Sequence, residues 1–130
     1  MHAIALRLCP QQDLQIELEA FVHKHQIEAA CILTCVGSLT TAVLRLAHQD
    51  TATTYDGYFE IVSLTGMMSV HGSHYHMAIA DSTGYTVGGH VLKGCRIYTT
   101  AELVVGILPD VSFHREPDLV TGYKELVIKT

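Results

Sequence analysis

From residue 58 to residue 108 the chain consists of short apolar-rich segments, separated by turns that contain glycine. Many of these segments alternate apolar and polar residues, which is typical of strands with one buried and one exposed face. The predicted strands here cover residues 58–68, 74–81, 85–92 and 95–108. Because strands joined by tight turns pair antiparallel, we expect an antiparallel sheet.

The rest of the chain adds further strands and one helix. Leu14, Leu18, Phe21 and Val22 recur at helical spacing, with Asp13 near the start of the segment and Lys24 near its end, as the helix dipole favours. Further strands are predicted over residues 2–8, 28–39, 41–48 and 124–129, and residues 49–57 are predicted to be a polar, exposed turn. The predicted fold class is α+β: a mostly antiparallel sheet of about seven or eight strands, with one principal helix packed on it, in a single domain over residues 1–130.

Composition bears on the assembly and on the partners of the chain. Of its 130 residues, 48% are hydrophobic and only 16% are charged, which is apolar for a small monomer and favours subunit association. No apolar run is long enough for a membrane span, and the N-terminus lacks the features of a signal peptide. We therefore expect a cytoplasmic protein with no membrane partner.

The charge balance argues against binding of nucleic acid by this domain alone. The formal net charge is −5 and no basic run is present, whereas non-specific affinity for DNA comes from Lys and Arg on phosphates.

Four cysteines, Cys9, Cys31, Cys35 and Cys95, form no C-x-x-C pair. We interpret them as small buried hydrophobic residues.

Four of the nine histidines lie between Val70 and His90. His74 and His76 are two residues apart in a predicted strand, so they share a face. If residues 82–84 form a three-residue hairpin loop, His76 lies directly opposite His90, and three imidazoles converge. A register shift of one residue would turn His90 to the other face.

Three neutral imidazoles with an open fourth position are typical of catalytic zinc sites, so His74, His76 and His90 are candidate zinc ligands. The alternative is that these histidines form hydrogen bonds across a polar subunit interface. Gly88 and Gly89 precede His90, and glycine within a strand often marks a bulge or a close approach by another group.

The segments 57–68, 74–95 and 99–106 resemble successive motifs of the PPC domain, a family conserved in plants and prokaryotes whose small prokaryotic members are described as candidate DNA-binding proteins. The resemblance implies a compact sheet with a flanking helix and a homotrimer. It also implies that His74, His76 and His90 are a metal-binding set. Plant relatives carry an AT-hook before this domain, whereas this chain has no R-G-R-P sequence, so a DNA partner is implied by the family description alone.

Two classes of function follow. The first is a non-enzymatic, metal-binding trimer with a regulatory or DNA-associated role. The second is a metal-dependent hydrolase or lyase in which zinc activates water and Glu60 or Glu102, carboxylates within predicted strands, moves the proton. His71 is a spare ligand or an exposed histidine, and His2, His48 and His114 are predicted to be surface residues.

Overall fold

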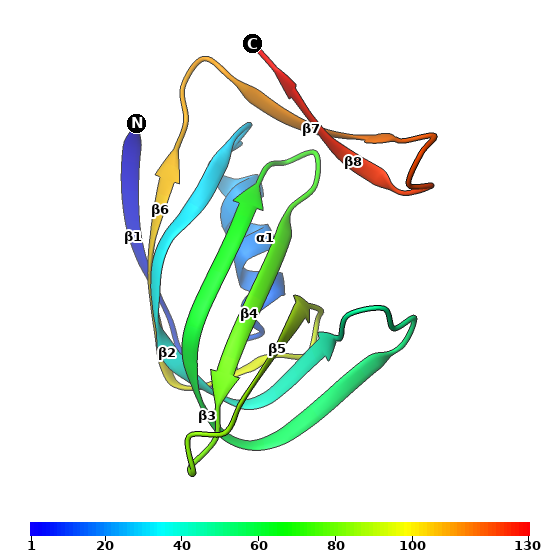
Figure 1. The fold of residues 1–130 in the computed structure, drawn as a ribbon. Coiled ribbons are helices and arrows are strands. Elements are labelled where there is room, and N and C mark those ends of the chain that lie inside the picture. Colours follow the sequence, from blue (N-terminus) through cyan, green and yellow to red (C-terminus); the bar gives the residue numbers. More distant parts are fainter.

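The computed structural model describes residues 1–130 and contains one helix and eight strands (Figure 1). The elements in chain order are β1 (His2–Leu8), α1 (Leu14–Lys24), β2 (Ala30–Arg45), β3 (Ala52–Met68), β4 (His74–Ala80), β5 (Thr86–Val91), β6 (Arg96–Ile107), β7 (Ser112–Pro117) and β8 (Lys124–Lys129).

Six strands form one antiparallel sheet in the order β1-β6-β2-β3-β4-β5, and β7 and β8 form a separate two-stranded sheet. The end of β2 also pairs with β5, through Leu44 with Val91 and Arg45 with His90. The large sheet therefore curls until its edge strand β5 returns to β2, with α1 on the inner side of the curve (Figure 1). The predicted α+β class with a mostly antiparallel sheet is confirmed.

The helix α1 is shorter than the periodic segment and begins directly after Asp13. The Asp13 carboxylate accepts a hydrogen bond from the Ile16 backbone N–H at 3.1 Å, which makes Asp13 the N-cap. Leu14, Leu18 and Val22 are buried in the core between the helix and the sheet, as their spacing predicted. The helix is not long and apolar enough to span a membrane.

The C-terminal segment forms a hairpin rather than one closing strand. β8 has the predicted bounds, but β7 was not predicted, because Pro109 and Pro117 flank a segment with no clear alternation. The hairpin lies beyond the end of the sheet where β3 ends and β4 begins (Figure 1).

Two predicted boundaries in the main sheet were wrong. β2 runs without interruption through residue 40, where two strands were expected, and its pairing with β3 shifts between Leu39 and Thr41. β3 begins at Ala52, so residues 52–57 are strand rather than turn. Both extensions are stabilised by hydrogen bonds to the neighbouring strand, which local sequence does not reveal.

The cysteines are less uniform than predicted. Cys95 is fully buried, Cys31 and Cys35 are half-buried, and Cys9 is exposed, so the prediction of burial was wrong for Cys9. All four are free thiols. Burial raises the pKa of Cys35 to about 11, which keeps its thiol neutral and unreactive.

Candidate metal centre

The register of the β4–β5 hairpin is set by its turn. Asp81 N–H donates to the Tyr85 carbonyl at 2.9 Å, and Gly84 N–H donates to the Asp81 carbonyl at 2.9 Å. Gly84 adopts a φ of 86°, which glycine tolerates at no steric cost. The loop therefore has the predicted three residues, and His76 pairs directly with His90.

Gly88 and Gly89 have a steric role on the way to His90. A Cβ at Gly88 would lie 2.8 Å from the Met77 carbonyl oxygen, and a Cβ at Gly89 would lie 2.8 Å from the Arg45 carbonyl oxygen. The absence of side chains thus allows β5 to approach β4 and β2 closely. This close approach brings His90 to the line where the curled sheet meets itself.

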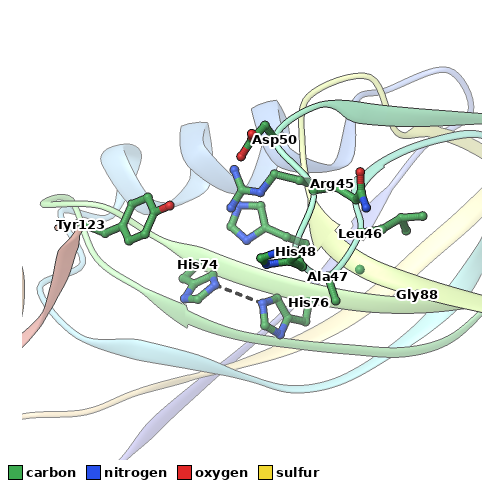
Figure 2. A pocket seen from close by; sticks show the side chains of 12 residues that line it. Arg45, Leu46, Ala47, His48, Asp50, His74, His76, Gly88 and Tyr123 are labelled. Carbon is green, nitrogen blue, oxygen red and sulfur yellow. Dashed lines mark hydrogen bonds between the residues drawn. The ribbon is translucent and has the colours of Figure 1, made fainter. Parts of the chain in front are cut away.

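The structure brings His74, His76 and His90 together. Figure 2 shows His74 and His76 with their rings toward each other. The Nε2 atoms of His74 and His76 are 3.1 Å apart, and the ring centroids of the three side chains are separated by 4.8, 5.0 and 5.8 Å. One ligand nitrogen from each ring lies within 4.8 Å of the other two. Small side-chain rotations would place all three nitrogens around one ion.

The electrostatics of the cluster favour neutral rings. Burial lowers the pKa of His90 to about 4, and the charge of Arg45, its pairing partner on β2, adds to the effect. Burial also lowers the pKa of His74 below 6.5, with further contributions from His76 and from Arg115 of β7. Because a metal binds the unprotonated imidazole, the lowered pKa values suit a metal site.

The three rings lie on one wall of an open cleft of about 880 Å³. Arg45, His48 and Asp50 line the cleft from the end of β2 and the following turn, and Tyr123 lines it from the hairpin end (Figure 2). His48 was predicted to be an ordinary surface residue, and neither Asp50 nor Tyr123 was singled out. No local pattern indicates them, because the curl of the sheet brings His48 and Asp50 to the cleft, and the docking of the β7–β8 hairpin brings Tyr123 there.

The two carboxylates considered for catalysis lie elsewhere. Glu60 and Glu102 are exposed, and neither lines the histidine cleft. Glu102 pairs with Arg7 across β1 and β6, and its carboxylate accepts a 3.4 Å hydrogen bond from Thr100. His71 is also absent from the cluster, since its ring is hydrogen-bonded to Glu28.

The residues that form the fold and the histidine cleft also match a known protein family. The sequence profile of the Plants and Prokaryotes Conserved (PCC) domain, also written PPC, matches residues 1–109. The chain belongs to this family. The match includes the β4–β5 hairpin with all three histidines and ends before the β7–β8 hairpin.

Similar proteins differ in their overall length. Bifunctional protein GlmU of Synechococcus sp. is 46% identical over 124 residues, which cover 95% of this PPC chain but 20% of the relative. AT-hook motif nuclear-localized protein 8 of Arabidopsis thaliana is 34% identical over 104 residues, covering 73% of this chain and 27% of the relative. The chain thus spans about a fifth to a quarter of the curated relatives it matches.

Solved structures share the fold over nearly the whole chain. A hypothetical protein of Salmonella enterica is 44% identical and has a TM-score of 0.97, over 99% of this chain and 94% of the other. A protein of Archaeoglobus fulgidus described as metal-containing is 24% identical with a TM-score of 0.82, over 98% of this chain and 94% of the other. A Bacteroides thetaiotaomicron protein described as a candidate DNA-binding protein is 20% identical, with a TM-score of 0.86 over 96% and 91% of the two chains.

Proposed function

We propose that this PPC protein is a zinc-binding homotrimer of the cytoplasm, built from a single domain over residues 1–130, with a regulatory or DNA-associated role. The observation that carries the zinc site is the convergence of His74, His76 and His90, whose ligand nitrogens lie within 4.8 Å of one another. Three imidazoles suit zinc and leave a fourth position open to a ligand. The metal-containing relative from Archaeoglobus fulgidus supports a metal in this fold, without indicating which one.

The DNA-associated part of the proposal depends on partners. Similarity to AT-hook proteins and to candidate DNA-binding proteins supports it. With a net charge of −5, the isolated domain should bind duplex DNA no tighter than the weak end of the range of about 10⁻⁴ to 10⁻⁶ M that is typical of non-specific complexes. A second protein or segment that is basic would therefore have to supply the contacts with DNA.

The zinc site is tested by metal content and thermal stability. We expect His90→Ala to lower the zinc content of the purified protein, measured by elemental analysis, by about one ion per chain. A chelator should lower the melting temperature of the wild type, because removal of a ligand bound only to the folded state destabilises that state. In His90→Ala the chelator should lower the melting temperature by much less, because the cleft no longer holds zinc.

The matched control is His23→Ala. His23 lies on α1 and its Nδ1 is 2.9 Å from the Glu19 carbonyl oxygen, so its removal should leave zinc content unchanged. Full zinc content in His90→Ala would contradict the site and would favour histidines that only form hydrogen bonds at a subunit interface.

A metal-dependent hydrolase or lyase is the second candidate. Zinc with an open position can act as a Lewis acid, and such an enzyme also needs a group that moves a proton. The carboxylate that lines the cleft is Asp50, and Glu60 and Glu102 do not. Asp50, and His48 beside it, are therefore the cleft residues of this chain that could transfer the proton. Loss of turnover in Asp50→Asn with zinc retained would support Asp50 in that role.

A further inference from the structure

A second cluster of ligand-type side chains lies where three separate segments meet at the end of the sheet. Glu28 comes from the link between α1 and β2, His71 from the β3–β4 turn and His114 from β7. His71 Nε2 is 2.7 Å from Glu28 Oε2, and the rings of His71 and His114 stack with centroids 3.9 Å apart. One ligand atom from each residue lies within 4.8 Å of the other two.

Backbone hydrogen bonds fix these segments against one another. Val70 N–H donates to the Ile27 carbonyl at 2.8 Å, and Phe113 N–H donates to the Glu28 carbonyl at 2.9 Å. The neighbours of all three candidate ligands are thus tied together directly. The backbone positions of the three residues are therefore set by the fold before any ligand binds.

The buried Ser69 joins the same frame from the β3–β4 turn. Its hydroxyl donates to the Phe113 carbonyl at 2.8 Å and accepts from the His71 N–H at 3.1 Å. One side chain thus links the backbone of His71 to the residue before His114. Hydrogen bonds that hold the surrounding backbone in this way help a metal site to keep its ligands in place.

We propose that Glu28, His71 and His114 bind a second zinc ion. Two imidazoles and one carboxylate form one of the known three-ligand sets for zinc. Ligand atoms around tetrahedral zinc are about 3.3 Å apart, given bond lengths of about 2.0–2.1 Å. The three atoms lie within 4.8 Å of one another, and the stacked rings of His71 and His114 must rotate before their nitrogens face one ion.

The exposure of the cluster sets the expected strength of this site. Glu28 and His71 have side-chain exposures of 53% and 38%, so the ion would remain accessible to water and to chelators. The His71–Glu28 hydrogen bond and the His114–Ser112 contact at 3.0 Å are both available to the free protein. Zinc must replace these contacts, and we therefore expect binding to be weaker than at the cleft.

The consequence of binding would be to fasten the β7–β8 hairpin to the main sheet. The two strands of this hairpin pair only with each other, and an isolated two-stranded hairpin is marginally stable in water. His114 supplies the hairpin's ligand, whereas Glu28 and His71 belong to the body of the protein. An ion held by all three would oppose opening of the hairpin.

The test uses the full chain with His90→Ala, so that the cleft does not contribute, and Zn²⁺ alone as the probe. We expect about one zinc ion to bind per chain in a calorimetric titration. At a free zinc concentration ten times the dissociation constant, hydrogen exchange of the β7 and β8 amides should slow about tenfold.

Adding His114→Asn to this background should abolish both the binding and the slowing of exchange, and adding Glu28→Gln should weaken both. His2→Asn, which removes an exposed histidine of β1, is the matched control and should change neither. Unchanged zinc binding in the His114→Asn double variant would overturn the proposal, as would zinc binding that leaves exchange of the hairpin amides unaltered. The first site fails separately, if the zinc content of purified His90→Ala, with His114 intact, equals that of the wild type.

Discussion

Arg45 and His90 face each other across the seam where the curled sheet meets itself. A guanidinium remains charged at any ordinary pH, so it opposes protonation of the imidazole beside it. Burial is the larger cause and Arg45 the next, and together they lower the pKa of His90 to about 4. Because this arrangement disfavours protonation of the His90 ring, it leaves a nitrogen lone pair free to bind a metal.

Replacing Arg45 with Met should therefore raise the pKa of His90 in the metal-free protein but leave it below 6.5, because burial remains. Imidazole NMR titration measures this shift. Since the folded chain holds the lower pKa, the unfolded chain takes up the proton first, and the wild type should lose stability as pH falls from about 6.5 towards about 4. A wild-type His90 that titrates at 6.5, or a pKa unmoved in Arg45→Met, would contradict this explanation.

The three cleft histidines could be predicted from sequence because each is placed by short-range rules. Alternation puts His74 and His76 on one face, and a three-residue loop pairs His76 with His90. Asp50 and Glu28 could not be predicted in the same way. Their neighbours come from distant parts of the chain, and only the curl of the sheet and the docking of the hairpin bring them close.

At the scale of the element, the Asp13 carboxylate and the apolar face of α1 together hold this helix in place. Asp13 is 4% exposed, and while one of its oxygens caps the helix at Ile16, the other accepts from the Gly94 N–H at 2.6 Å. Gly94 lies in the β5–β6 turn, so the same side chain joins the helix to the strand pair that carries His90. The capping role follows from sequence, but the contact with Gly94 does not.

Asp13→Ala should lower the free energy of unfolding by about 2–4 kcal/mol, because it removes the cap and leaves the half-buried Gly94 N–H without its protein partner. Asp13→Asn is the matched control and should cost less, since one amide oxygen can still cap the helix. Urea denaturation followed by circular dichroism measures both variants. Equal losses in the two would mean that capping contributes little and that the negative charge itself is what stabilises this region.

The elements themselves were predicted with uneven success, for physical reasons. The strands from residue 74 to residue 107 have nearly their predicted bounds, because glycine turns delimit them. β7 lacked such a signal, and its strand geometry depends on pairing with β8. Local propensity therefore accounts for the hairpins joined by tight turns, whereas tertiary pairing accounts for the extended ends of β2 and β3.

At the scale of the whole molecule, the sheet leaves apolar side chains uncovered. Val36 of β2 and Val62 of β3 are 63% and 59% exposed, and they lie side by side because their neighbours Gly37 and Ile61 are paired. Val36 also lines a shallow hollow with Leu103 and Val104 of β6. Exposed apolar surface of this kind is typical of a protein interface. It is a reason, independent of the family resemblance, to expect that subunits associate.

Because the family resemblance implies a homotrimer, we expect light scattering at micromolar concentration to give about three times the 14.3 kDa mass of one chain. Val36→Asp places a charge in the proposed interface, where it would lose its hydration without gaining a partner, and should shift the protein towards monomers. Val120→Asp makes the same change in the β7–β8 turn at a valine that is 95% exposed, and should leave the mass unaltered. A wild type that is monomeric would contradict the homotrimer. A trimer that persists in Val36→Asp would place its interface on another surface.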